Sequence, residues 1–375
     1  MKLALLAVAA LVLHGTAAAP APRLRLTGPV KELAADGGRI AVLVQTSRPG
    51  CTVARVAVWQ PSTRSLAPIG ASPCSESVST GAGIFSVALA GTRVAYVQYA
   101  GGNTRELELR SATLTARRPV TIASASFGLD EASGTYIGRV AGDGSLLAFD
   151  WWSLCPACAG AARPQPDRSS IWRVAGSNAC PNAGLGSARL CTVVRSGVGT
   201  LRLLSAAAGS LALLQPDGSV AVVTAAGATT ATIPFAAGEL RAARLDSDGQ
   251  RLVALVSAGS AKNALRAYDP TGALVATYPL PTARTSGDAT CGDPNGCKLP
   301  ALRLEDVDSG IAVYVLGAQI HLIRLADGKT ATIRPPGRTP VHAQLERDGL
   351  YYSYSLTARS SRVAFTPFSK LPWGS

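Results

Sequence analysis

The stretch from Leu245 to Val256 decides the fold and reads Leu-Asp-Ser-Asp-Gly-Gln-Arg-Leu-Val-Ala-Leu-Val. An Asp-Gly pair is typical of a tight turn between antiparallel strands, because both residue types tolerate the backbone angles that such turns require. The apolar run after the pair is typical of a buried strand. The stretch therefore predicts a strand, a tight turn at Asp248-Gly249 and a second, almost wholly apolar strand.

Near-copies of this stretch recur along the chain. A turn that contains glycine precedes an apolar strand seven times, at spacings of about 40 to about 64 residues, which suits propeller blades with variable insertions. A third strand is expected after every copy and a fourth after six of them. The seven turns are Asp36-Gly37, Ala90-Gly91, Asp143-Gly144, Ala208-Gly209, Asp248-Gly249, Ser309-Gly310 and Asp348-Gly349.

The last copy lacks a fourth strand, because the chain ends soon after Phe368. A spare strand, Arg23 to Thr27, lies near the start of the chain and would complete that blade. We therefore predict an all-β fold: a seven-bladed β-propeller of four-stranded antiparallel blades, with the N-terminal strand completing the last blade. The alternative, a pair of β-sandwiches, explains the turn spacing less well and leaves the N-terminal strand without a role.

The composition favours many short strands and does not favour nucleic acid as a partner. Hydrophobic residues make up 47% of the 375 residues and aromatic residues only 5%, and small and β-branched residues alternate with turn formers. The net charge of +13 comes from arginine, since only six lysines occur. Codon bias in a GC-rich genome also explains this excess. No Lys/Arg run or basic patch with interleaved aromatic residues accompanies it.

The first nineteen residues read as a secretory signal peptide. Lys2 supplies a positive charge, Leu3 to Leu13 is an apolar run, and small residues follow up to Ala19. Cleavage is expected after Ala17 or Ala18, and an uncleaved membrane anchor is the alternative. No later segment has the length and apolarity of a membrane span. We therefore expect one β-propeller domain over residues 20–375, in a secreted or other extracytoplasmic protein.

The stretch Leu245 to Val256, with Ala264 to Gly272, resembles the repeat of TolB-type, WD40-like bacterial β-propellers. Those repeats carry a similar Asp-Gly turn between the first two strands and an Asp-x-x-Gly turn between the third and fourth. The chain departs from the eukaryotic WD40 pattern, since it has no Gly-His and no Trp-Asp pair, and it lacks room for the separate N-terminal domain of TolB. The resemblance implies an exported protein-interaction scaffold without catalytic residues.

The long insertions predict which face of the propeller binds. Connections from second to third strands and between blades share one face, which we call the loop face; the other connections share the turn face. Rigid repeat scaffolds usually bind where loops are long, although tolerated surface drift is the alternative. One insertion, Ala175 to Ala188, falls on the turn face. Those of the loop face are Thr46 to Thr52, Ala71 to Gly83, Ser124 to Thr135, Ser153 to Ser169 and Pro281 to Ala301.

Eight cysteines follow the signal peptide, an even number that favours disulfides in an oxidising compartment. Two other interpretations are not favoured. Cys155-Pro156-Ala157-Cys158 lacks the βαβ surroundings of a redox motif, and the four cysteines of the third blade lack the spacing of a zinc site. Loop positions favour the pairs Cys51–Cys74, Cys155–Cys158, Cys180–Cys191 and Cys291–Cys297.

The sequence offers no recognisable catalytic motif, metal site or cofactor site. It has no Gly-x-Ser-x-Gly, no His-Glu-x-x-His and no phosphate loop, and Asp246 to Gly249 lacks the later ligands of a calcium loop. His321 and His342 are isolated within predicted strands and are interpreted as structural. Paired carboxylates stay open, because such pairs form only in three dimensions.

One patch stands out as a candidate binding surface on the loop face. Trp151 and Trp152 end a predicted strand there, and Arg163 and Arg168 lie in the loop that follows. Exposed tryptophan and arginine are typical of binding surfaces. The alternative is that strand alternation buries one tryptophan between blades while the other covers a disulfide.

These observations favour an exported, non-enzymatic scaffold that binds a protein, a peptide or a cell-envelope component through the loop face. The alternative is a secreted lyase or glycoside hydrolase that acts at the central channel. The channel lining discriminates between them. Two or more carboxylates, or a cluster of Arg, Asp and His, would favour catalysis, whereas Ala, Ser and Thr would exclude it.

Overall fold

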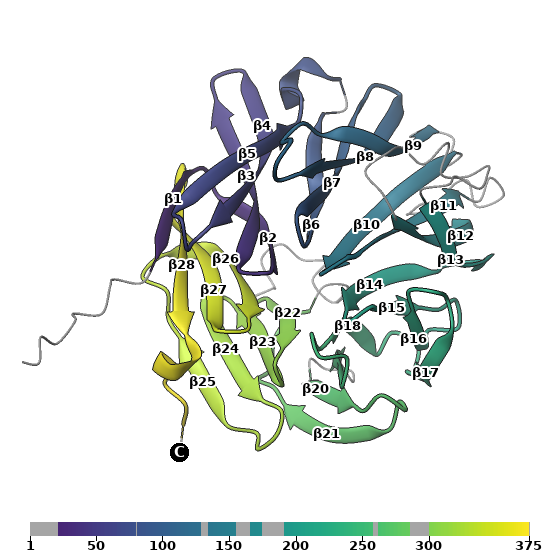
Figure 1. The fold of residues 1–375 in the computed structure, drawn as a ribbon, viewed down its shortest axis with the longest axis vertical. Helices are drawn as coiled ribbons and strands as arrows, with labels where there is room; N and C mark the ends of the chain where they lie inside the picture. The colour runs from purple at the N-terminus through teal and green to yellow at the C-terminus, as the bar shows by residue number, and fades with distance from the viewer. Residues whose placement is uncertain are drawn as a thin grey trace, which may run out of the picture.

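Seven four-stranded antiparallel sheets stand in a ring around a central axis (Figure 1). The structure is a computed structural model and describes residues 22–79, 81–128, 134–154, 166–174, 191–257, 262–285 and 300–374. Each sheet is one blade, and its four strands follow each other outward from the axis in chain order, except in the last blade. The prediction of a seven-bladed β-propeller is confirmed.

The strands occupy the same four positions in every blade. The innermost strands are β2 (Val30–Asp36), β6 (Gly83–Ala90), β10 (Thr135–Asp143), β14 (Arg202–Ala207), β18 (Leu240–Leu245), β22 (Leu302–Asp308) and β26 (Arg338–Glu346). The second strands are β3 (Arg39–Arg48), β7 (Arg93–Gly101), β11 (Leu146–Leu154), β15 (Ser210–Leu214), β19 (Leu252–Ser257), β23 (Ile311–Leu316) and β27 (Gly349–Thr357).

The outer half of each blade is equally regular. The third strands are β4 (Cys51–Gln60), β8 (Thr104–Thr113), β12 (Pro166–Val174), β16 (Val220–Thr224), β20 (Asn263–Tyr268), β24 (Gln319–Arg324) and β28 (Ser360–Pro367). The outermost strands are β5 (Ser65–Ala71), β9 (Val120–Gly128), β13 (Cys191–Val198), β17 (Thr229–Ile233), β21 (Leu274–Pro279), β25 (Thr330–Ile333) and β1 (Arg23–Thr27). Two single-turn 3₁₀ helices, η1 (Ser75–Ser77) and η3 (Phe368–Lys370), complete the described elements.

The N-terminal strand closes the ring, as predicted. β1 pairs antiparallel with β28 from Arg23 opposite Ala364 to Thr27 opposite Ser360, and it is the outermost strand of the last blade. The contact between the last and first blades is also packed in the interior, where the rings of Trp59 and Tyr351 meet edge to face at 6.2 Å. Both ends of the propeller domain are therefore held in one sheet.

The apolar core lies between adjacent blades. Every residue of β19 is buried, because a second strand has sheet neighbours on both sides and a blade packed on each face. In the outermost strand of the same blade, β21, no residue is buried: its first two residues are exposed, and half-buried and exposed residues alternate after them. An almost continuous apolar run therefore marks the second strand of a blade, as the repeated stretch predicts.

The glycine turns join first to second strands on the turn face. In the first blade Gly37 and Gly38 have φ angles of 59° and 70°, which is the left-handed backbone of a two-residue hairpin turn. The stretch Leu245 to Val256 differs from its copies. Its connection runs from Asp246 to Arg251 and is not a two-residue turn, since β18 ends at Leu245 and β19 begins at Leu252.

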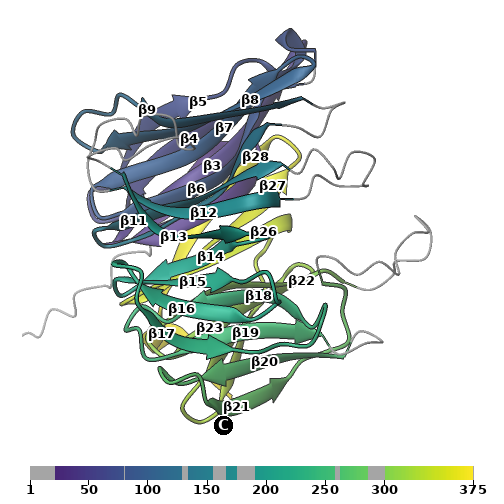
Figure 2. The same ribbon diagram turned by 90° about the vertical axis from the view of Figure 1, so that its right-hand side faces the viewer.

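The loop face is the side toward which the outermost strands β13 and β21 point in Figure 2. One of the long loops predicted on this face is not a loop. Thr46 to Thr52 is an extended hairpin, because β3 runs on to Arg48 and β4 begins at Cys51. Ala71 to Gly83 is a connection that contains η1. Ser124 to Thr135 is shorter than predicted, because β9 runs on to Gly128 and β10 begins at Thr135. The other three predicted insertions, on both faces, lie largely outside the described residues.

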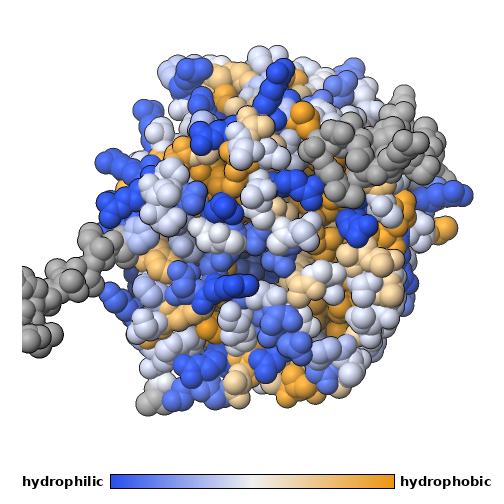
Figure 3. Space-filling model, in the orientation of Figure 1, coloured by the Kyte–Doolittle hydropathy of each residue, from blue (hydrophilic) through white to orange (hydrophobic). Residues whose placement is uncertain are grey.

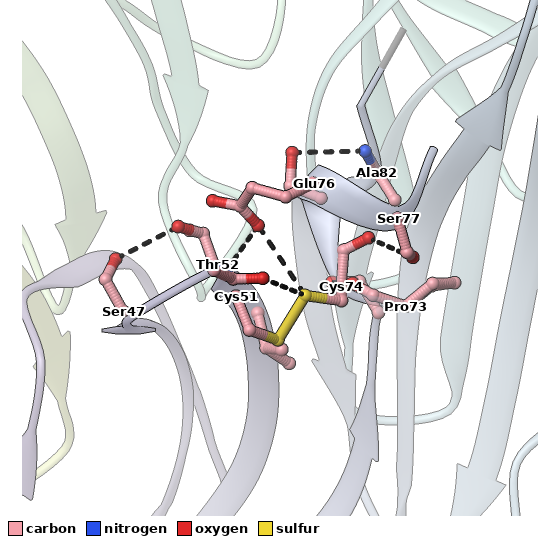
Figure 4. The surroundings of a disulfide bond; sticks show 12 residues. Ser47, Cys51, Thr52, Pro73, Cys74, Glu76, Ser77 and Ala82 are labelled. Carbon is pink, nitrogen blue, oxygen red and sulfur yellow. Dashed lines mark hydrogen bonds between the residues drawn. A yellow bond between two sulfur atoms is a disulfide. The ribbon is translucent and has the colours of Figure 1, made fainter. Parts of the chain in front are cut away.

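A disulfide joins the loop-face end of β4 to the residue before η1 (Figure 4). The predicted pair Cys51–Cys74 is confirmed, with a Cα–Cα distance of 5.2 Å. The N–H of Thr52 donates to Glu76 Oε2 at 2.6 Å, and this hydrogen bond lowers the pKa of Glu76. Cys191 is also disulfide-bonded. Its predicted partner Cys180 lies outside the described residues, as do Cys155, Cys158, Cys291 and Cys297.

Candidate functional site

The central channel contains two cavities that meet at a layer of charged side chains. A cavity of about 860 Å³ opens toward the loop face and one of about 770 Å³ toward the turn face. We call them the loop mouth and the turn mouth. Both are lined by Glu32, Arg139, Arg244 and Glu305, which we call the charged layer. The inner strands start on the loop face and end on the turn face, so the first residues of each strand line the loop mouth.

Bulges in the inner strands supply the side chains of the loop mouth. The pairing register shifts between Val30 and Glu32 in β2, and again between Ile84 and Ser86 in β6. A bulge sets two residues against one and re-aims their side chains, so consecutive residues can face the same cavity. Lys31 and Glu32 both line the loop mouth for this reason. Sequence periodicity alone does not reveal such positions.

Glu305 is the best-bound carboxylate of the charged layer. Its Oε1 accepts a hydrogen bond from Arg303 Nε at 2.7 Å, and its Oε2 lies 3.5 Å from His342 Nδ1. Burial alone would raise the pKa of Glu305, but the contacts with His342 and Arg303 outweigh burial and lower it. Glu305 therefore carries a negative charge that its neighbours balance.

Glu32 behaves in the opposite way, although it belongs to the same layer. Its Oε2 accepts the N–H of Val87 from the next blade at 3.1 Å. Burial raises the pKa of Glu32 to about 7, despite the opposing positive charge of Arg139. The charged layer thus holds one carboxyl group whose pKa is lowered, Glu305, and one whose pKa is raised to about 7, Glu32.

The two arginines of the charged layer make no ion pair with a carboxylate among the described residues, although the charges of Asp306, Glu305 and Glu32 act on Arg244 from beyond ion-pair distance. Arg244 donates only to backbone carbonyls, from Nε to Glu305 at 3.1 Å and from Nη1 to Ala243 and Leu204 at 3.0 and 3.2 Å. Burial, followed by the nearby charge of Arg139, lowers the pKa of Arg244 to about 9. Arg139 makes no side-chain hydrogen bond or ion pair within the described ranges. Such guanidinium groups retain donors for an anion.

Aromatic rings form one wall of the loop mouth. Tyr136 stacks on Trp152 with ring centroids 4.6 Å apart and lies 6.2 Å from Phe85, whose side chain is 38% exposed. The guanidinium of Arg202 lies 4.6 Å from the centroid of Trp152. Gly138 makes this packing possible, because a Cβ there would collide with the ring of Trp152. Phe85, Tyr136 and Trp152 therefore all line the cavity, and Trp152 also supports the ring of Tyr136.

Asp150, next to these rings, joins the third blade to the fourth. Its carboxylate accepts the N–H of Arg139 and, at 3.1 Å, the N–H of Leu203. Burial raises the pKa of Asp150 to about 6, against the lowering effect of these hydrogen bonds. Asp150 is thus engaged by the fold on both of its oxygens.

The turn mouth is acidic, and three of its carboxylates accept backbone N–H groups of neighbouring blades. Asp36 accepts the backbone N–H groups of Gly91 and Gly144 from the next two blades, the second at 3.0 Å. Asp143 accepts the N–H of Ala208 at 2.8 Å, and Glu346 accepts that of Gly38 at 3.2 Å. Burial raises the pKa of Glu346 to about 7. Figure 3 shows this face, with hydrophilic side chains around its centre.

The structure separates the residues of the predicted surface patch. Trp152 is only 6% exposed and supports the loop mouth, which agrees with the alternative that alternation buries one tryptophan. Trp151 points to the opposite side of the blade, since neighbours on a strand alternate. It lines a separate cavity of about 350 Å³ with the exposed Arg168. Arg163 lies outside the described residues.

The two histidines also differ. His321 stacks on Tyr314 at 4.9 Å, its Nδ1 lies 3.1 Å from Thr332 Oγ1, and burial lowers its pKa. These contacts agree with a structural role. His342 instead lines the loop mouth beside Glu305.

Sequence reasoning missed Glu32, Phe85, Arg139, Arg244 and Glu305. The available signal was a charged or aromatic residue within an inner strand that is otherwise small and apolar. Among the described residues, no group of three or more His, Cys, Asp or Glu side chains could hold a metal ion. No helix in the described ranges is long and apolar enough to cross a membrane.

Comparison with known proteins identifies a fold and not a family. No protein-family model and no curated protein matches the chain. A prolyl endopeptidase structure is 13% identical, with a TM-score of 0.43, over 87% of this chain and 54% of that one. An acylaminoacyl peptidase from Pyrococcus horikoshii is 10% identical, with a TM-score of 0.52, over 93% of this chain and 52% of that one.

The chain therefore spans about half the length of these two peptidases. TolB from Acinetobacter baumannii is 15% identical, with a TM-score of 0.39, over 69% of this chain and 56% of that one. The WD40 domain of coronin from Toxoplasma gondii is 11% identical, with a TM-score of 0.49, over 93% of this chain and 87% of that one. The strand pairing shows that the chain is a seven-bladed β-propeller, and these comparisons add no more than the fold.

Proposed function

We propose that the protein is an exported scaffold that binds a protein, a peptide or a cell-envelope component through its loop face, with the loop mouth as the binding site. One observation carries this proposal: the loop mouth combines an exposed aromatic wall with guanidinium groups that the described residues leave without carboxylate partners. A mostly apolar concave site with a few convergent polar groups is the usual form of a ligand site.

Export is supported by the sequence pattern of residues 1–19, which is typical of a signal peptide, and by the Cys51–Cys74 disulfide, since disulfides persist in oxidising compartments. The test is the mass of the protein recovered from the extracytoplasmic fraction. A chain that begins at Ala18 or Ala19 is expected, whereas an intact chain that starts at Met1 and fractionates with the membrane would contradict export as a soluble protein.

The binding proposal is tested by capture of partners from the envelope fraction on immobilised protein. Phe85→Ala and Arg202→Gln alter the loop mouth and are expected to abolish the capture of a specific partner. A matched control is Leu274→Ser/Val275→Ser, which changes two side chains that are each 54% exposed on the outer strand β21. Equal capture by all three variants would refute the loop mouth as the site. Trp151→Ala tests the separate cavity beside Arg168 in the same way.

A second candidate function, a lyase or glycoside hydrolase, is favoured by the carboxyl groups of the channel. Glu32 and Glu305 line one cavity with pKa values shifted in opposite directions, which is the pattern of an acid and base pair. Cleavage of cell-wall or plant polysaccharides by the exported protein tests this candidate. Activity that Glu32→Gln and Glu305→Gln each abolish would support it, and no cleavage of any substrate tried would favour the scaffold.

A further inference from the structure

The charges of the loop mouth do not balance within the described residues. Glu305 is engaged by Arg303 and His342, and Asp150 by two backbone N–H groups. Glu32 accepts a backbone N–H from Val87. Arg139 and Arg244 line the same cavity without a carboxylate partner, and Arg202 and Lys31 add further positive charge. An anionic ligand would supply the missing partner.

The surroundings of these arginines restrict the kind of anion. A carboxylate is planar and accepts two parallel hydrogen bonds from a guanidinium group, and it carries a single charge. A phosphate dianion would bring more negative charge against Glu32 and Glu305 of the same layer. The cavity therefore favours a monoanion such as a carboxylate.

The wall beside Arg139 determines what the carboxylate is attached to. Phe85 and Tyr136 come from β6 and β10, the inner strands of adjacent blades, and β10 also carries Arg139. Phe85 is 38% exposed, a large apolar side chain beside a cavity of about 860 Å³. Aromatic rings gain most by contact with another ring or a large apolar group.

We propose that the loop mouth binds a carboxylate next to an aromatic or large apolar group, with Arg139 and Arg244 holding the carboxylate and Phe85 and Tyr136 contacting the apolar group. This proposal rests on the proposed function and names the chemistry that the loop mouth recognises. A small carboxylic acid and the C-terminus of a peptide that ends in a large apolar residue share this chemistry.

Isothermal titration of the full exported protein tests the chemistry with defined probes. N-acetyl-phenylalanine is expected to bind at least about tenfold more tightly than N-acetyl-phenylalaninamide, which lacks the charge, and than N-acetyl-alanine, which lacks the ring. The tetrapeptide Gly-Gly-Gly-Phe distinguishes the two sources. Tighter binding of this peptide than of N-acetyl-phenylalanine identifies a peptide C-terminus, and weaker binding identifies a small acid.

Variants place the probe in the loop mouth. Arg139→Gln is expected to weaken N-acetyl-phenylalanine binding about tenfold, since it removes a charged donor whose side chain makes no other hydrogen bond within the described ranges. Arg139→Lys keeps the charge and is expected to recover part of the loss. Phe85→Ala is expected to lower the affinity for N-acetyl-phenylalanine more than the affinity for acetate. Arg347→Gln, at the turn mouth, is the matched control and is expected to leave binding unchanged.

Three results would overturn the proposal: equal binding of acid and amide, tighter binding of inorganic phosphate than of the acid, or no binding of any probe at millimolar concentration. These failures are distinguishable from failure of the proposed function. If no probe binds but Phe85→Ala still abolishes the capture of an envelope partner, the loop mouth is a binding site and only the carboxylate chemistry is wrong.

Discussion

The two mouths of the channel are built from the same seven inner strands, yet they use charge in opposite ways. At the turn mouth, Asp36, Asp143 and Glu346 accept backbone N–H groups of neighbouring blades. At the loop mouth, Arg139 and Arg202 have no carboxylate partner among the described residues. Polar groups that the fold satisfies contribute to stability, whereas donors that the fold leaves open are available to a ligand.

This difference predicts how substitutions at the two mouths affect stability and binding. Substitutions at the turn mouth are expected to change the free energy of unfolding and leave ligand binding intact. Substitutions at the loop mouth are expected to do the reverse. The loop side has structural exceptions: the Cys51–Cys74 disulfide at its rim, and the carboxyl groups of Glu32 and Asp150, which accept backbone N–H groups of neighbouring blades.

The largest expected effect is the loss of this disulfide. The bond closes a loop with a sequence separation of 23, and the chain-entropy model gives a destabilisation of about 3 kcal/mol for Cys51→Ser/Cys74→Ser. Denaturant unfolding measures the change. Affinity for N-acetyl-phenylalanine is expected to stay within about twofold of wild type, since neither cysteine lines the loop mouth. A large loss of affinity would show that the rim and the loop mouth are coupled.

The next effect separates the turn mouth from the loop mouth directly. Asp36→Ala removes the acceptor of two backbone N–H groups from different blades. The substitution is expected to lower the free energy of unfolding by about 2 kcal/mol. This is less than the sum for two fully buried hydrogen bonds to a charged group, because Asp36 is only half-buried. Asp348→Ala is the control, because Asp348 lies on the same face and is exposed. Equal stability of the two variants would mean that the acidic residues of the turn mouth do not hold the blades together.

The same comparison explains what could be predicted from the sequence. Each blade is formed by consecutive residues and needs a glycine turn and an apolar second strand within about 50 residues. Signals such as Asp36-Gly37 and Leu252 to Val256 can therefore be recognised from the local sequence. The N-terminal strand was predictable because Arg23 to Thr27 fills the one missing position. The cysteine pair was predictable because both loops fall on one face.

The charged layer was not visible for a physical reason. Its members Glu32, Arg139, Arg244 and Glu305 come from four blades, and ring closure alone brings them together. Bulges decide which residue of an inner strand faces the channel, and nothing in the local pattern marks a bulge. The structure divides the prominent Trp151-Trp152 pair between two cavities, because alternation sends the two rings to opposite sides of a blade.

A pH-dependent effect of intermediate size arises from Glu32. The carboxyl group of Glu32 binds its proton more tightly in the folded protein than in the unfolded chain, because burial raises its pKa from 4.5 to about 7. The resulting stability is complete below the unfolded pKa and is lost as pH rises through about 7. Glu32→Gln keeps an acceptor for Val87 but cannot ionise. The full pKa shift would amount to about 3 kcal/mol, but Glu32 is only half-buried, so the variant is expected to become about 1–2 kcal/mol more stable relative to wild type as the pH rises from 4.5 to 8.

Chemical denaturation at the two pH values measures this gain as a difference between wild type and Glu32→Gln. Other channel carboxyls with raised pKa values, Asp150 and Glu346 among them, are present in both proteins and cancel in the difference. A difference that does not change with pH would show that Glu32 is as well solvated in the channel as in the unfolded chain. The loop mouth would then be a wetter and less selective cavity than its lining indicates.

The smallest expected effect is the salt dependence of binding. It tests whether the charges of the turn mouth influence binding at the loop mouth over a long range. The Debye length is about 14 Å at 50 mM salt and about 6 Å at 300 mM, so screening weakens exposed charges more than those inside a cavity. Affinity for N-acetyl-phenylalanine is expected to fall about two- to threefold between these concentrations, because the contacts with Arg139 and Arg244 lie within the channel.

Asp348→Asn at the turn mouth is expected to change this dependence by less than about twofold, since the charged layer separates the two cavities. A tenfold fall with salt would place the anion at exposed Lys31 on the rim instead of at the charged layer, and a marked effect of Asp348→Asn would show that the two mouths act as one electrostatic site.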